Sequence, residues 1–200
     1  MPDFLYICNV NRDCDMKDNK IQLETERLLL RPWKVSDATV LYKLASDAEV
    51  GTNAGWPPHS SEEESRQIIT TVFDNPTTWA IVSRVSNEVI GAIGYGPSCD
   101  CNLPAKNDEP TVGYWLGKAY WNKGYCTEAL QALLAHIWQH TTITSLISGH
   151  FVDNPASGRV MEKCGFRPTG ETCYDVRLYQ GIGRPISVLR IEKNNRGYSI

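Results

Sequence analysis

The order of elements in the second half of the chain is the feature that most constrains its fold. Apolar and β-branched runs alternate there with amphipathic runs, which predicts a strand over 111–116, a helix over 128–139, a strand over 145–152, a helix over 155–163 and a strand from residue 166. Parallel strands need a crossover connection that is usually a helix. The second half is therefore expected to place parallel strands side by side.

The first half has the pattern of an antiparallel meander. Its strands are expected over residues 28–32, 79–84 and 89–95, the last two with the spacing of a hairpin. Its helices are expected to begin at Ser36 and at Ser60 or Ser61, and its loops to cover residues 51–58 and 96–110. Together the two halves predict an α+β, mixed α/β fold.

Length and composition indicate one domain. Two hundred residues, 42% of them hydrophobic and 22% charged, suit a single core, so we expect a domain over 21–200 and a flexible N-terminal arm over the polar residues 1–20. The formal net charge of −3 argues against a nucleic-acid partner. The apolar run over residues 4–8 is too short for an export signal or a membrane span. We therefore expect a cytoplasmic protein with no membrane partner, either a monomer or a homodimer.

The cysteines predict no metal site. Seven are present, an odd number without the spacing of a disulfide framework, so we expect reduced thiols. Cys99 and Cys101 form the one close pair, but a single intervening residue is too short for a zinc knuckle and no matching Cys or His pair follows.

A glycine-bearing turn over residues 120–129 precedes the long helix. Gly124 permits a turn that aims successive backbone N–H groups at the positive end of the helix dipole, a geometry that binds a pyrophosphate. The alternative interpretation is an ordinary helix start with a glycine turn.

The second informative segment covers residues 154–166. Asn154 lies at the end of a strand, where its side chain could hydrogen-bond an amide of a ligand, and Ser157 follows one helical turn later on the same side. The alternative is that Asn154 caps the helix, Ser157 faces water, Gly165 ends the helix and Phe166 anchors the core.

These two segments, together with residues 23–32 and 112–116, resemble the GNAT acetyltransferase superfamily in its RimJ/RimL branch, over about residues 21 to 192. The resemblance implies a single domain with a strongly twisted mixed sheet of about six to seven strands and about four helices. It also implies a V-shaped gap between the fourth and fifth strands, here residues 111–116 and 145–152, that holds acetyl-CoA as co-substrate.

The resemblance also implies which residues bind the cofactor. Backbone amides of the turn would hold the pyrophosphate, the fourth strand would pair with the pantetheine arm, and the residues concerned are Trp115, Leu116, Asn122, Lys123, Gly124, Tyr125, Cys126, Thr127, Asn154, Ser157 and Arg159. The turn departs from the superfamily pattern, which usually begins with Arg or Gln and ends with Gly or Ala. Trp121 and Cys126 occupy those places, and backbone-mediated binding should survive because Cys126 is small.

Amine acetylation requires deprotonation of an ammonium, stabilisation of an oxyanion and departure of a thiolate. The resemblance places the thiolate near Ser157 and the pantetheine amide at Asn154, and a backbone N–H near Tyr114 is the candidate oxyanion donor. Many relatives carry a tyrosine as the acid where this chain has Met161. The base remains open between Glu109, His150 and an ordered water, because Thr111 replaces the acidic residue that related sequences often carry.

The predicted function is therefore acetyl transfer from acetyl-CoA to a primary amine, in a peptide N-terminus or a small molecule, through a ternary complex. Residues 56–59 would lie over the amine site in this family, or form a plain surface loop. Two alternatives remain: a non-catalytic acyl-CoA sensor that has lost its base, and an unrelated nucleotide-binding α/β domain.

Overall fold

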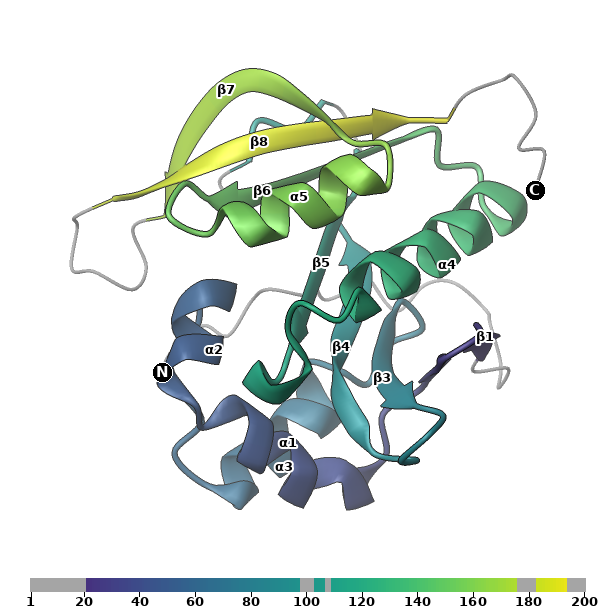
Figure 1. Cartoon of the computed structure of the whole chain (residues 1–200), viewed down its shortest axis with the longest axis vertical. Helices are drawn as coiled ribbons and strands as arrows, with labels where there is room; N and C mark the ends of the chain where they lie inside the picture. The colour runs from purple at the N-terminus through teal and green to yellow at the C-terminus, as the bar shows by residue number, and fades with distance from the viewer. Residues whose placement is uncertain (1–20, 98–102, 107–108, 176–182, 194–200) are drawn as a thin grey trace.

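The computed structural model describes residues 21–97, 103–106, 109–175 and 183–193 (Figure 1). The predicted arm over residues 1–20 and the pair Cys99 and Cys101 lie outside this part. Within it, one eight-stranded sheet has the order β1-β2-β3-β4-β5-β6-β8-β7. Its strands are β1 Leu23–Glu24, β2 Leu28–Arg31, β3 Thr78–Ser83, β4 Val89–Gly96, β5 Thr111–Leu116, β6 Ser145–Phe151, β7 Arg167–Asp175 and β8 Arg184–Glu192. The α-helices are α1 Ala38–Ala45, α2 Ala48–Ala54, α3 Glu62–Thr71, α4 Tyr125–His140 and α5 Pro155–Lys163, and 3-10 turns cover Val35–Asp37 and Lys118–Tyr120.

Helices cover both faces of the sheet, and β3 shows why. Trp79 and Ile81 pack into a core that includes the apolar face of α4, whereas Ala80 and Val82 pack into a second core with α1 and α3. Because side chains of a strand alternate between the two faces, an almost continuous apolar strand is buried on both sides. The fold is therefore a three-layer arrangement with a core on each side of the sheet.

The sheet changes character between β5 and β6. Strands β1 to β5 pair antiparallel in sequence order, whereas β5 and β6 are parallel and share one bridge, Thr111 with Ile147. Ile147 N–H donates to Pro110 O at 3.0 Å, and Ser148 Oγ donates to Val112 O at 2.8 Å. Beyond these contacts, no further residues of β5 and β6 pair in the described part of the chain. The two strands therefore separate toward the C-terminal end of β5.

The predicted fold class is confirmed, with differences in detail. The short strand β1 adds one strand to the count, so the expected gap between the fourth and fifth strands lies between β5 and β6. Residues 51–58 were expected to form a loop, but α2 covers the first part of them. Asp47 starts this helix by accepting a hydrogen bond from Glu49 N–H at 2.9 Å, and Gly55 ends it in the left-handed conformation with φ of 87°. No helix in the described residues has the length and apolarity to cross a bilayer.

Candidate active site

A cavity of about 350 Å³ lies where β5 and β6 separate. Its wall comes from α2, β5, the turn before α4 and α5. It includes every predicted cofactor-binding residue except Lys123. Tyr114, Asn154 and Ser157, three of the predicted catalytic residues, line it as well, whereas Glu109 and His150 do not. The structure thus brings together the two informative sequence segments, residues 120–129 and 154–166.

The turn before α4 presents backbone N–H groups to this cavity. Asn122 and Gly124 both have left-handed backbone conformations, with φ of 58° and 79°. Glu128 N–H donates to Gly124 O at 3.1 Å, so the preceding N–H groups of the first helical turn have no partner within the helix. Successive N–H groups in such a turn, at the positive end of a sixteen-residue helix, form a site for an anion.

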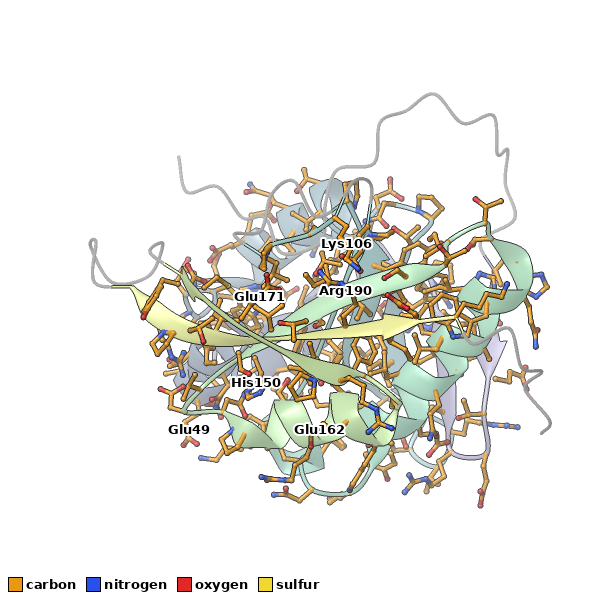
Figure 2. All side chains as sticks on the ribbon, turned by 90° about the horizontal axis from the view of Figure 1, so that it is seen from above. Glu49, Lys106, His150, Glu162, Glu171 and Arg190 are labelled. Atoms are coloured by element: carbon orange, nitrogen blue, oxygen red, sulfur yellow. The ribbon has the colours of Figure 1, made fainter. Side chains whose placement is uncertain are left out.

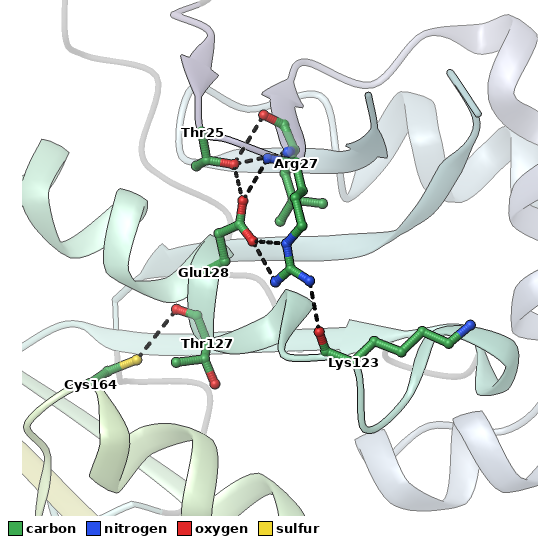
Figure 3. A network of polar contacts seen from close by, with 7 residues as sticks. Thr25, Arg27, Lys123, Thr127, Glu128 and Cys164 are labelled. Atoms are coloured by element: carbon green, nitrogen blue, oxygen red, sulfur yellow. Dashed lines mark hydrogen bonds and ion pairs between the residues drawn. The ribbon is translucent and has the colours of Figure 1, made fainter. Parts of the chain in front are cut away.

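A network of hydrogen bonds joins this turn and the start of α4 to residues 25–27, between β1 and β2 (Figure 3). The carboxylate of Glu128 accepts from Thr25 Oγ1 at 2.6 Å and from the backbone and side chain of Arg27 at 2.9 and 2.7 Å. Arg27 Nη1 also donates to Lys123 O at 3.0 Å, and its guanidinium lies 4.7 Å from the centre of the Tyr125 ring. Burial alone would raise the pKa of Glu128, but the hydrogen bonds from Thr25 and Arg27 hold it below its usual value. The link between β1 and β2 therefore fixes the shape of the turn.

The edge of β5 is open on the side of the cavity. Gly117 N–H donates across to Ile90 O in β4, whereas Pro110 O accepts from β6, so odd-numbered peptide groups face β4 and even-numbered ones face β6. Leu116 O follows this rule and accepts from Trp121 Nε1 at 2.7 Å. By the same alternation the N–H and C=O of Tyr114 face the gap. An extended ligand with amide groups could pair with them as a strand does.

The first turn of α5 forms the opposite wall. Asn154 starts this helix, but its side chain makes no capping hydrogen bond, and its Nδ2 instead lies 3.4 Å from Asn53 O in α2. The Tyr114 hydroxyl donates to Ser157 O at 2.8 Å and lies 3.1 Å from Ser157 Oγ. Burial raises the pKa of Tyr114 well above its usual value, so the hydroxyl is neutral. The alternatives in which Asn154 is a side-chain cap and Ser157 faces only water therefore do not hold.

Neither Cys126 in the cavity wall nor the neighbouring Cys164 has the lowered pKa of a nucleophilic thiol. Burial, followed by the neighbouring Cys164, raises the pKa of Cys126 to about 12, and burial raises that of Cys164 to about 12. A thiol attacks as its thiolate, which is scarce at neutral pH when the pKa is this high. A covalent enzyme intermediate through these cysteines is thus disfavoured.

The structure places Glu109 away from the cavity. This carboxylate is 4% exposed and accepts from Arg190 Nε at 2.8 Å, from Lys106 N–H at 3.1 Å and from Ser145 Oγ. Burial would raise its pKa, but the hydrogen bonds, led by that from Arg190, lower it below the usual value. A carboxylate with a lowered pKa is a weaker base. Its observed contacts join the start of β5 to β6 and β8.

His150 also lies apart from the cavity wall. Its Nδ1 lies 2.8 Å from Phe151 O, and a Cβ added to Gly158 would lie 2.6 Å from its Nε2. Figure 2 shows the ring beside α5, on the opposite side of β8 from Arg190. The imidazole therefore fills the space between the sheet and the helix, the packing role that a histidine in a strand often has.

Sequence reasoning missed several parts of the wall. Val50, Asn53 and Ala54 of α2 line the cavity, as does Lys163, one helical turn after Arg159 on α5. Arg184 ties α2 to this wall, because it donates to Thr52 O and pairs with Asp153 at 2.6 Å. Asp47, just before residues 48–54, is the signal in the sequence that could have indicated α2. The contact between Arg184 and Thr52 could not be predicted, because the two residues are 132 apart in sequence.

Residues 56–59 lie beside the cavity. The ring of Trp56 meets Trp115, which lines the cavity, edge to face at 5.6 Å. His59 is buried, with Nδ1 2.8 Å from Ser65 Oγ, and burial lowers its pKa despite the nearby charge of Glu64. Trp56 and His59 therefore pack inward at the two ends of this loop, whereas Pro57 and Pro58 between them are exposed.

No group of three or more His, Cys, Asp and Glu side chains in the described part of the chain could hold a metal ion. The cavity instead combines an anion-binding turn with an open strand edge. Such a pair of features suits a long ligand that carries phosphates at one end and amides along its length.

Comparison with known proteins agrees with this geometry. The family model of the acetyltransferase (GNAT) domain matches residues 27–167. The chain is 27% identical over 153 residues to the uncharacterised N-acetyltransferase p20 of Bacillus licheniformis, covering 74% of this chain and 83% of that protein. It is 29% identical over 115 residues to the ribosomal-protein-serine acetyltransferase of Escherichia coli, covering 56% of this chain and 62% of that protein.

Solved structures show the same fold. RimL, a ribosomal L7/L12 alpha-N-protein acetyltransferase solved in complex with coenzyme A, has a TM-score of 0.70 at 20% identity, covering 86% of this chain and 98% of that one. The predicted resemblance to RimJ/RimL-like enzymes and the predicted acyltransferase class are therefore confirmed. The match over residues 27–167 and the shared fold establish that this chain belongs to the GNAT acetyltransferase family.

Proposed function

We propose that this N-acetyltransferase moves an acetyl group from acetyl-CoA directly onto a primary amine within a ternary complex. The observation that carries the proposal is the continuity of one cavity, which runs along the turn before α4, the open edge of β5 and the first turn of α5. Coenzyme A has the matching order of groups, with a pyrophosphate, two amides and a terminal thiol.

In this proposal the N–H groups of residues 122–127 hold the pyrophosphate, and the open edge of β5 pairs with the pantetheine arm. Arg159 and Lys163 have no ion pair in the described residues and lie on the cavity wall, so they can meet the phosphates of the cofactor. Asn154 would hydrogen-bond a pantetheine amide. RimL, which shares this fold, was solved in complex with coenzyme A, and this supports the choice of cofactor.

The chemical step needs an oxyanion donor and a site for the leaving group. The backbone N–H of Tyr114 faces the gap and is our candidate donor to the carbonyl oxygen of the thioester. Ser157 is the candidate hydroxyl for the departing thiolate. Since neither Glu109 nor His150 reaches the cavity, we propose that water accepts the proton of the ammonium. Alignment of the two reactants then supplies much of the rate, about 7–11 kcal/mol in favourable cases.

The acceptor is proposed to be the amine of a protein N-terminus or of a small molecule. The ribosomal-protein-serine acetyltransferase among the relatives supports the first choice. A panel of N-terminal peptides and small amines, with free thiol measured as the product, tests the reaction. We expect thiol release with at least one amine, and a strong loss in Ser157→Ala and Asn154→Ala but not in the surface control Ser86→Ala. Stabilisation by acetyl-CoA without thiol release for any amine would support the non-catalytic sensor instead.

A further inference from the structure

The Tyr114 side chain joins β5 to α5 beside the place where β5 and β6 separate. It comes from β5, yet its hydroxyl bonds to the first turn of α5, which follows β6. No strand pairing joins β5 to β6 at this level in the described residues, and the hydroxyl is a direct polar link between β5 and α5, two elements that line the cavity. It ends on the one side chain of α5, Ser157, that we propose to face the thiol.

The titratable groups that act on Tyr114 are neutral thiols. Burial, more than any neighbouring group, keeps the pKa of Tyr114 high, and the raised pKa of Cys126 and of Cys164 keeps both thiols neutral. Met161, which stands where many relatives carry a tyrosine, is fully buried in the core. Within the described part of α5, Ser157 is therefore the hydroxyl available at the cavity, and Tyr114 is its partner.

We propose that Tyr114 is a positioning residue that acts through Ser157 to stabilise the thiolate of coenzyme A. This inference rests on the proposed function. In the resting site the Tyr114 O–H donates to Ser157 O, and the two hydroxyl oxygens are 3.1 Å apart. When a thiolate is present, Ser157 O–H donates to the sulfur, and the Tyr114 hydrogen turns from Ser157 O to Ser157 Oγ. Two hydroxyls in series polarise each other and strengthen the final hydrogen bond.

The step conserves atoms and electrons without an ionised side chain. Collapse of the tetrahedral intermediate breaks the bond between carbon and sulfur, and the sulfur takes the electron pair. Both hydroxyls keep their protons, because they are weaker acids than a thiol of ordinary pKa near 8.5. The proton released by the amine reaches the thiolate through solvent. The hydroxyl pair thus lowers the energy of the thiolate and does not act as the acid.

The pKa of the coenzyme A thiol in the binary complex tests this inference without an acceptor. It is read from the ultraviolet absorbance of the thiolate as pH is raised. A hydrogen bond to a charged group is worth about 1.5–3 kcal/mol, so we expect the bound thiol to titrate about 1–2 pH units below free coenzyme A. Ser157→Ala should remove this shift, Tyr114→Phe should remove a measurable part of it, and Ser157→Thr should retain it.

Two comparisons separate positioning from a structural role. In the Ser157→Ala background, Tyr114→Phe should change the thiol pKa no further, because its effect passes through Ser157. Tyr95→Phe removes a hydroxyl from the neighbouring strand β4, away from the cavity wall, and should leave the thiol pKa unchanged.

Three other results would contradict either this inference or the proposed function. If Tyr114→Phe changes only thermal stability or coenzyme A affinity while the thiol pKa stays at the wild-type value, the hydroxyl has only a structural role and the inference is wrong. An additive effect in the double variant would place Tyr114 in direct contact with the sulfur and would overturn the role of Ser157 as intermediary. Absence of any coenzyme A binding by the wild-type protein would instead remove the proposed function.

Discussion

Two glycines with the same backbone conformation allow the role of the turn before α4 to be measured. Gly124 in that turn has φ of 79°, and Gly170 in β7 has φ of 81°. An added Cβ at Gly124 would meet only Arg27 Nη2 at 3.4 Å, and at Gly170 it would meet no atom within 4 Å. Substitution by alanine therefore imposes similar backbone strain at both places, but one lies at the cavity and the other does not.

The magnitude follows from the conformation. A left-handed alanine costs about 1–2 kcal/mol, and the lower entropy of the unfolded chain returns about 0.4–1 kcal/mol, which leaves a net loss of roughly 0–1.6 kcal/mol. For a chain of this size the melting temperature should fall by up to about 6 °C in each variant. Loss of one charge-assisted hydrogen bond to the pyrophosphate should weaken coenzyme A binding by about 10- to 100-fold in Gly124→Ala alone.

Differential scanning calorimetry and isothermal titration calorimetry provide the two measurements. We expect both variants to lose similar stability and only Gly124→Ala to lose affinity. Equal coenzyme A affinity in the two variants would show that the conformation of this turn does not matter for the cofactor, and our reading of the turn would be wrong.

Three further predictions concern charged groups. The pKa of Glu128 is lowered on folding, so its stabilising effect should be complete above its unfolded pKa of about 4.3 and should fade as the pH falls below that value. Glu128→Gln should therefore lower the free energy of unfolding more at pH 7 than at pH 3. The control variant Glu26→Gln, at an exposed position, should show no such pH dependence. Glu109→Ala should destabilise the protein by about 3–5 kcal/mol in urea unfolding, because it leaves the charge of Arg190 unpaired, yet coenzyme A affinity of the folded protein should not change. Arg159→Ala should weaken binding of coenzyme A about three- to tenfold more than binding of the analogue without the 3′-phosphate, and equal weakening of both ligands would contradict a contact with that phosphate.

Elements with clear local signals were predicted well from the sequence. The helix over residues 155–163 has proline at its first position and Gly165 just after its end, and the structure places α5 on those residues with Gly165 at φ of 96°. The strand over 111–116 was likewise bounded by turn residues. For α4 the signal was weaker, since the apolar face suggested a start at residue 128 and the helix begins at Tyr125 after the left-handed Gly124.

Contacts between distant segments were beyond sequence reasoning. Glu109 looked like a candidate base because acidic residues near that strand are common in related sequences, but its partner Arg190 lies 81 residues away. Glu128 is joined to Arg27 across 101 residues, and no local pattern indicates that this pair supports the turn. The packing of His150 against Gly158 was equally hidden, because the periodicity of a strand does not reveal which helix will cover it.

The central claim is that the turn before α4 grips a pyrophosphate while the edge of β5 receives the pantetheine arm. Amide chemical shifts from two-dimensional NMR, recorded as ligands are added, test both parts at once. Adenosine diphosphate should shift the amides of residues 122–127 but not those of β5, and coenzyme A should in addition shift Tyr114 and Leu116. If coenzyme A binds while the amides of the turn keep their positions, the account is contradicted.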